Sequence, residues 1–152
     1  MPDVVHTMGL GARSLETILE VLAASRARTV VDVRRYGSSA RHPHHQGSSL
    51  HGALRERGFE VHALGDLLGG DRTGGYPRYM ETPAFRRGLE RLEALAAAAP
   101  TMVLCAELVP ERCHRRFLGA ALEERGWRVA HHLAALSERT ARGQMRLVRR
   151  TG

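Results

Sequence analysis

The sequence contains no lysine and no asparagine, and its only isoleucine is Ile18. All 23 of its Lys and Arg residues are therefore arginine, and the formal net charge is +7. A positive charge of this size is common in proteins that bind nucleic acid. Arginine in place of all lysine, beside abundant Ala, Gly and Leu, also matches the codon bias of a GC-rich genome. The net charge by itself therefore does not assign a nucleic-acid partner.

Long apolar runs and numerous cysteines are also missing. No stretch approaches the roughly 20 apolar residues that a membrane-spanning helix needs, and the first residues lack a signal-peptide pattern. The two cysteines, Cys105 and Cys113, are too few for a disulfide framework. We therefore expect a cytoplasmic protein with reduced thiols and no membrane partner.

The apolar pattern alternates between strands and helices along 152 residues. Short apolar runs, many of them β-branched, predict strands, whereas apolar residues at helical spacing predict helices. The expected strands are 4–8, 29–33, 59–64, 102–106 and 127–133; the expected helices follow Ser14, span 50–57, run from Thr82 to Ala99, and run from Pro110 to Gly126. We expect a long loop over Gly65 to Tyr79. This order predicts one α/β domain over residues 1–136 with a mostly parallel sheet, and a basic C-terminal tail over 137–152.

In such a sheet, right-handed crossovers place the loops that follow strands one, two and four at the same edge. These loops are residues 9–13, 32–45 and 105–116. Ligands of α/β proteins usually bind at the carboxyl ends of the strands. We therefore expect a pocket at this edge.

Several cationic side chains lie where the fourth strand passes into the next helix: Arg112, His114, Arg115 and Arg116. The helix dipole disfavours cations at a helix N-terminus. A bound anion would explain this arrangement, and surface solvation would tolerate it without one. The alternatives differ by only ~0.3–1 kcal/mol per interaction, so the sequence leaves both open.

The same junction carries candidates for catalysis. Cys105 ends a strand, where it could serve as a nucleophilic thiol or simply fill the core. Glu107 follows it as a candidate general base or as an ion-pair partner of a nearby arginine. Cys113 lies four residues before Phe117, so it is expected to support the helix core.

A carboxylate interrupts the apolar second strand at Asp32. We favour an ion pair with an arginine at the strand ends over a catalytic role, because a buried carboxylate needs a partner. The following loop contains Arg41 and His42, which could contact a substrate. The histidines of this region do not match the spacing of metal ligands, so we expect neither a metal nor a cofactor.

Several of these segments resemble the domain-of-unknown-function family 488. The matching stretches are Thr7-Met8-Gly9, Arg13-Ser14-Leu15, Val31 to Arg34, Ser39 to Pro43, Leu67 to Gly70, Leu104 to Glu107, Pro110, Cys113 to Arg116, and Gly126 to His131. The family typically has a histidine where this chain has Leu10. A fainter resemblance is to rhodanese-type domains, which also place an Asp-x-Arg at one strand end and a cysteine at another. The first resemblance implies little about chemistry.

Three hypotheses follow. The first is an enzyme-like pocket for an anionic, phosphate-bearing ligand, including a nucleotide or nucleic acid, with acid–base function from Glu107 and His114. Its ligand-binding residues would be Arg34, Arg41, His42, Arg115 and Arg116, with Asp32 and Cys113 in supporting positions. The second is a rhodanese-like thiol enzyme that uses Cys105. The third is a catalytically silent ligand- or partner-binding module, which Leu10 favours.

Overall fold

The computed structural model describes residues 3–35, 43–106 and 114–132. Its centre is a five-stranded sheet in the order β3-β2-β4-β1-β5, and every paired strand is parallel to its neighbour. The strands are β1 (Val4–Gly9), β2 (Thr29–Asp32), β3 (Glu60–Ala63), β4 (Thr101–Cys105) and β5 (Arg128–His132). The expected α/β class is confirmed, and the sheet is wholly rather than mostly parallel.

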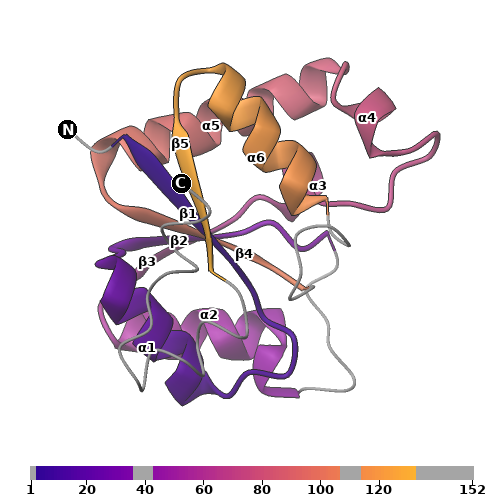
Figure 1. Cartoon of the computed structure of the whole chain (residues 1–152). Helices are drawn as coiled ribbons and strands as arrows, with labels where there is room; N and C mark the ends of the chain where they lie inside the picture. The colour runs from indigo at the N-terminus through magenta and orange to yellow at the C-terminus, as the bar shows by residue number, and fades with distance from the viewer. Residues whose placement is uncertain (1–2, 36–42, 107–113, 133–152) are drawn as a thin grey trace.

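Helices cover both faces of this sheet (Figure 1). They are α1 (Leu15–Ser25), α2 (Gly47–Glu56), α3 (Gly65–Leu68), α4 (Tyr76–Tyr79), α5 (Pro83–Ala98) and α6 (Arg115–Glu124), with a 3-10 turn, η1, at Pro43–His45. Helices α1 and α2 lie on one face, and α5 and α6 lie on the other. None of these helices is both long and apolar enough to cross a membrane.

Each face of the sheet has its own hydrophobic cluster. Ile18 and Leu22 of α1 pack with Leu54 of α2 in one cluster, and Leu89 of α5 packs with Leu122 of α6 in the other. Strand β4 is buried at all five positions, which is typical of a central parallel strand with helices on both sides. A fully buried Leu side chain contributes about 1.5–3 kcal/mol, so this two-sided burial holds β4 rigidly.

Two predicted helix caps are confirmed. The Ser14 hydroxyl accepts a hydrogen bond from the backbone N–H of Thr17 at 3.1 Å, and α1 begins at Leu15. The Thr82 hydroxyl accepts one from the N–H of Phe85 at 3.2 Å, and Pro83 occupies the first turn of α5. Each cap satisfies a donor that the helix leaves unpaired, which fixes where the helix starts.

The structure corrects two predicted boundaries. The segment from Gly65 to Tyr79 is not one loop, because α3 and α4 form within it. Helix α2 begins at Gly47 rather than at residue 50. The expected helical start at Pro110 lies outside the described residues, within which α6 begins at Arg115. Helices of four residues show no apolar period, which is why the pattern missed α3 and α4. The predicted tail over 137–152 lies outside the described residues.

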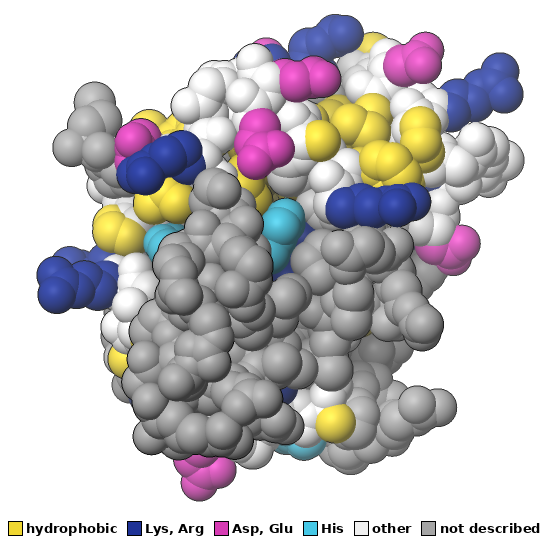
Figure 2. Space-filling view, in the orientation of Figure 1, with side chains coloured by type: hydrophobic (Ala, Val, Ile, Leu, Met, Phe, Trp, Pro, Cys, Tyr) yellow, Lys and Arg dark blue, Asp and Glu magenta, His cyan; other side chains and the backbone are white. Residues whose placement is uncertain are grey.

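Figure 2 shows how charge is distributed on one face of the molecule. Dark-blue side chains, which are all arginine in a chain without lysine, are interspersed with magenta acidic ones over the described surface. Among the described side chains on this face, the positive charges are therefore mixed with negative ones rather than gathered into one basic patch.

Candidate functional site

The carboxyl ends of three strands meet at one edge of the sheet, as the topology predicts. Gly9 of β1 is in register with Cys105 of β4, and Asp32 of β2 is in register with Leu104. The polar segments that follow these strands therefore leave the sheet side by side. This edge is the candidate site.

At the end of β2, Asp32 is the centre of a buried polar network. Its carboxylate accepts hydrogen bonds from Arg34 Nη2 and from His51 Nε2, each at 2.8 Å. Burial alone would raise the pKa of Asp32, but these bonds from His51 and Arg34 lower it to about 2. The expected ion pair is confirmed, with both side chains about 95% buried (5% and 4% exposed).

The guanidinium of Arg34 is already engaged in this network. Besides Asp32, it donates from Nη1 to the carbonyl oxygen of His45 at 2.6 Å. Arg34 therefore ties the end of β2 to the 3-10 turn at Pro43–His45. This arrangement supports a positioning role for Arg34 beside the ligand-binding role that the sequence suggested.

At the end of β4, Cys105 lies beside His114. The Cys105 side chain is buried, and its Sγ is 4.0 Å from Nδ1 of His114. Cys105 is disulfide-bonded, which corrects the expectation of reduced thiols. Sequence counting argued against a framework of many bridges, and it could not exclude a single one.

The His114 ring is neutral near pH 7. Burial is the main reason that its pKa falls to about 4, and the charges of Arg115 and Arg72 lower it further. A neutral imidazole can accept a proton but has none to spare as an acid. His114 therefore fits the base half of the predicted acid–base pair.

The two arginines that open α6 lie in different environments. Arg115 is fully buried (0% exposed) and donates from Nη1 to the hydroxyl of Thr7 on β1 at 3.2 Å. Arg116 is exposed, and its guanidinium carbon lies 4.5 Å from the centre of the Phe117 ring. One side chain thus ties α6 to the sheet, and the other faces solvent. The predicted residues Glu107, Arg41, His42 and Cys113 lie outside the described residues.

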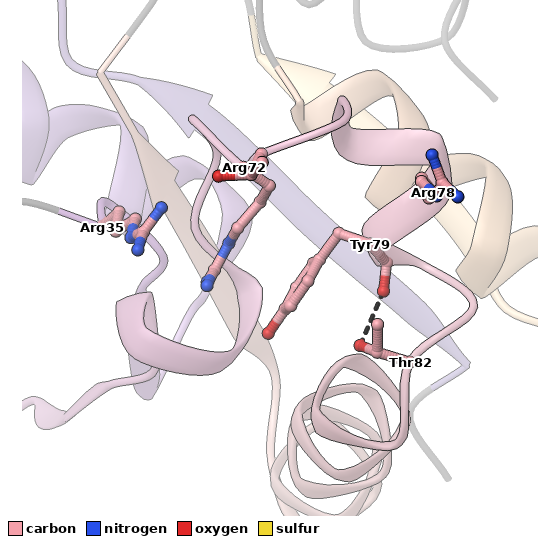
Figure 3. Close-up of a pocket in the computed structure, with 6 residues that line it drawn as sticks. Arg35, Arg72, Arg78, Tyr79 and Thr82 are labelled. Atoms are coloured by element: carbon pink, nitrogen blue, oxygen red, sulfur yellow. Dashed lines mark hydrogen bonds between the residues drawn. The ribbon is translucent and has the colours of Figure 1, made fainter.

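A cavity of about 400 Å³ opens beside this edge (Figure 3). Its lining consists of Arg35, Arg72, Thr73, Arg78, Tyr79 and Thr82. Half of the lining residues are arginine and none is acidic. In Figure 3, Arg35 and Arg72 extend toward the same space, while Arg78 lies on the other side of Tyr79.

Arg72 forms a fixed wall of this cavity. Its guanidinium donates to the carbonyl oxygens of Gly65, Asp66 and Gly69 at 3.2, 2.7 and 2.8 Å. Its guanidinium carbon also lies 3.9 Å from the centre of the Tyr79 ring. Because carbonyls at the C-terminal end of α3 lack helical partners, Arg72 caps that short helix and is held in place by it.

Glycines allow the cavity wall to approach the end of β2. A Cβ at Gly65 would lie 1.9 Å from the carbonyl oxygen of Arg34, and one at Gly69 would lie 2.5 Å from Cβ of Arg35. Only residues without a side chain can pack this closely against that backbone. The close approach places Arg35 beside Arg72, and Arg35 Nη1 donates to the carbonyl oxygen of Asp71.

The segment that carries most of the cavity lining also contacts His114, through residues that do not themselves line the cavity. A Cβ at Gly70 would lie 2.9 Å from Nδ1 of His114, and the rings of Tyr76 and His114 have centroids 5.1 Å apart. The charge of Arg72 is one of the causes of the low His114 pKa. A neutral base and an arginine-lined cavity therefore lie next to each other.

Sequence reasoning did not select Arg35, Arg72 or Arg78 as ligand-binding residues. The available signal was the combination of arginines and glycines in the segment from Gly65 to Tyr79, which predicted flexibility rather than a wall. Leu10, the departure from the family pattern, is buried in the cluster that contains Ile18 (1% exposed). At that position this chain therefore has a core side chain in place of a polar one. Among the residues that the structure describes, no group of three or more His, Cys, Asp or Glu could hold a metal ion.

The model of the family described as Domain of unknown function DUF488 matches residues 71–122. This match confirms the first resemblance over that segment, which includes α4, α5 and β4. Five of the six cavity-lining residues lie in it, and Arg35 lies outside it. No curated protein and no solved structure matches the chain, so the fainter likeness to rhodanese-type domains stays a prediction.

Proposed function

We propose, for a chain whose residues 71–122 match the DUF488 family, that the cavity at the sheet edge binds a phosphate-bearing anionic ligand. The observation that carries this proposal is the lining of the cavity, which has three arginines and no acidic residue. The charges of Arg35 and Arg72 face one space, with Arg78 across the Tyr79 ring, and a bound dianion replaces their mutual repulsion with attraction.

The geometry favours phosphate over a single carboxylate. Arg35 and Arg72 extend into the same space from different elements, so two guanidinium groups can contact different oxygens of one ligand. Arg78 and Thr73, both exposed, add a third cation and a hydroxyl at the rim. A tetrahedral anion with several oxygens can use such contacts from several directions, whereas a carboxylate offers two coplanar oxygens.

His114 gives this pocket its enzyme-like character. As a neutral imidazole beside the cavity, it can accept a proton from a water or hydroxyl group that attacks the bound ligand. Glu107, outside the described residues, stays the predicted acid–base partner. The proposed reaction class is hydrolysis or transfer at the phosphate-bearing group, with arginines holding the anion and His114 as base.

Arg78 gives the cleanest test, because it is exposed and we expect its replacement to leave the fold intact. We expect Arg78→Ala to weaken binding of pyrophosphate or ADP about tenfold or more, since a hydrogen bond to a charged group contributes roughly 1.5–3 kcal/mol. Arg87→Ala, an exposed arginine on α5 outside the lining, is the matched control. Isothermal titration calorimetry gives the affinities. Equal affinities for the two variants would refute the cavity as the binding site.

A second candidate is thiol chemistry at Cys105, which the 4.0 Å separation from His114 Nδ1 favours. A thiolate needs a nearby base or cation, and the disulfide must first be reduced. After reduction, an activated Cys105 should react with iodoacetamide at about pH 6, where an ordinary thiol of pKa about 8.5 is protonated. Mass spectrometry locates the label, and the unreduced protein is the control. A reduced but unlabelled Cys105 would indicate a packing role.

A further inference from the structure

Another arginine at the sheet edge, Arg13, is buried, and its guanidinium has no hydrogen-bond partner among the described residues. Its residue is 7% exposed, and its Nε, Nη1 and Nη2 atoms are all inaccessible to solvent. Within the described structure, none of these three nitrogens has a hydrogen-bond acceptor. A guanidinium carries five N–H donors, so this side chain leaves an entire set of donors unsatisfied.

The backbone of Arg13 is held firmly. Its N–H donates to the carbonyl oxygen of Leu10 at 2.9 Å. Its own carbonyl oxygen accepts hydrogen bonds from Nε2 of His44 at 2.9 Å and from Nε2 of His45 at 2.7 Å. These bonds hold the turn between β1 and α1 from two sides, and they fix the backbone from which the Arg13 side chain extends.

The side chains near Arg13 do not neutralise it. His132 at the end of β5 feels the charge of Arg13, and its pKa falls to about 3, mainly through burial. Its ring bonds that of His6 on β1, with Nε2 and Nδ1 3.0 Å apart. Burial also lowers the pKa of His6. Both rings are neutral near pH 7, so they are polar neighbours that bring no negative charge.

An uncompensated charge in this position is costly. The effective penalty for burying an ion is several kcal/mol unless a counter-charge repays it. Burial lowers the pKa of Arg13 only to about 10, so the side chain remains charged near pH 7. Helix α1 begins two residues later, and the partial positive charge of its N-terminus acts in the same direction. The charge of Arg13 and the N-terminus of α1 together favour a bound anion.

We propose that Arg13 is the centre of an enclosed site for one small tetrahedral oxyanion, of the phosphate or sulfate class, between the β1–α1 turn and the end of β5. The five donors of the guanidinium bind such an anion through two parallel hydrogen bonds. The neighbouring imidazoles can present N–H groups to its remaining oxygens. This site is independent of the arginine-lined cavity, with which it shares no residue.

Replacing Arg13 by methionine tests the proposal, because methionine keeps much of the volume and removes the charge. The melting temperature is measured against sodium phosphate and sodium sulfate at constant ionic strength. We expect the wild-type protein to gain roughly 5–10 °C once the anion exceeds its Kd about a hundredfold. In an Arg78→Ala background, which weakens anion binding in the cavity, we expect Arg13→Met to abolish the gain. Without the anion, Arg13→Met should be at least as stable as its parent, since a buried unpaired charge has been removed.

Two controls separate this site from other effects of salt. Arg28→Met removes an exposed arginine and should keep the full gain, which accounts for general exclusion effects of phosphate and sulfate. Arg78→Ala in the cavity should also keep it, so this proposal and the proposed function can fail separately. A gain retained in Arg13→Met in the Arg78→Ala background, or no gain in the wild type, would overturn the proposal.

Calorimetry covers the case in which Arg13→Met does not fold. Phosphate titrated into the Arg78→Ala protein should still show one binding site. Arg13→Lys keeps a charge but loses the planar fork of donors, and we expect it to bind phosphate about tenfold or more weakly than wild type. Equal affinity in Arg13→Lys and wild type, or no binding in Arg78→Ala, would overturn the proposal.

Discussion

Arg34 and Arg13 are both nearly buried at the same edge of the sheet, and they differ in one respect. The Arg34 side chain lies 2.8 Å from the carboxylate of Asp32 and also bonds the carbonyl oxygen of His45. The Arg13 guanidinium has no acceptor among the described residues. The fold thus neutralises one charge internally and leaves the other, which is the physical distinction between an arginine that holds structure and one that awaits a ligand.

Removing the counter-charge of Arg34 should have the largest effect. Asp32→Asn converts Arg34 into a buried cation with a weaker partner, and we expect a loss of about 3–5 kcal/mol in the free energy of unfolding. Urea unfolding followed by circular dichroism measures it. Asp3→Asn breaks a solvent-exposed ion pair with Arg128 and should cost far less than Asp32→Asn, because solvent screens exposed charges. Similar losses in the two variants would mean that burial does not distinguish these pairs.

Lowering the pH should reduce the free energy of unfolding through the buried histidines first and through the Asp32 network at lower pH. The pKa of His132 is held at about 3 and that of His114 at about 4, mainly by burial, against 6.5 in an exposed histidine. The unfolded chain therefore binds more protons, so the free energy of unfolding falls as the pH is lowered from about 6.5 toward 4 and 3. Each histidine should account for on the order of 3–5 kcal/mol, with the larger share from His132.

Asp32 acts in the same direction in a lower window. Its pKa is about 2 in the folded protein against an ordinary 3.8, so its contribution is complete above 3.8 and is lost below. Urea unfolding at several pH values checks both windows. We expect His132→Gln to flatten the curve between about pH 6.5 and 3, while the loss from Asp32, which begins below 3.8, stays. An unchanged slope in this variant would show that His132 is protonated in the folded state.

Disturbing the backbone beside Arg34 should have an intermediate effect. A Cβ at Gly65 would lie 1.9 Å from the carbonyl oxygen of Arg34, so Gly65→Ala must push β2 and α3 apart. We expect a loss of about 1–3 kcal/mol, typical of overpacking, together with weaker ligand binding in the cavity. Gly52→Ala, on α2 with open space around its Cβ position, should be neutral or stabilising. Thermal unfolding and pyrophosphate titration of both variants test this.

The smallest effect is expected at an exposed arginine of α6, Arg116. Arg116 is exposed and lies over the ring of Phe117. Arg116→Ala should change the free energy of unfolding by about 0.5–1 kcal/mol, the usual strength of an exposed cation–π contact. Urea unfolding measures this as well. A loss as large as that of Asp32→Asn would mean that Arg116 stabilises the fold as strongly as the buried pair of Arg34 and Asp32 does.

Much of the fold followed from local patterns. The cap at Ser14 and the Thr82-Pro83 start of α5 were predicted because a side chain bonds a backbone group only a few residues away. Strands β2 and β4 were predicted because parallel strands buried on both faces read as apolar runs. Helices α3 and α4 were missed because four residues carry no period and because tertiary contacts, such as the carbonyls that Arg72 caps, hold the first of them.

The site was predictable only where its chemistry is local. Asp32 and Arg34 are two residues apart at a strand end, so their ion pair followed from the need of a buried carboxylate for a partner. The cavity did not, because Arg35 and Arg72 come from different segments and meet only after Gly65 and Gly69 pack against β2. The sequence also did not predict that the Arg13 guanidinium lacks an acceptor among the described residues, because this depends on all the side chains that fold around it.

The sequence by itself determined the α/β class, the order of strands and helices, and the edge at which polar residues gather. These features follow from the apolar periodicity of neighbouring residues and from the order of the elements along the chain. Only the tertiary structure decided which of the many arginines are neutralised. That decision depends on distances between side chains far apart in the chain. Arg34 forms an ion pair with the carboxylate of Asp32, and Arg115 donates to a hydroxyl on β1. Arg13 is buried with neither kind of partner among the described residues.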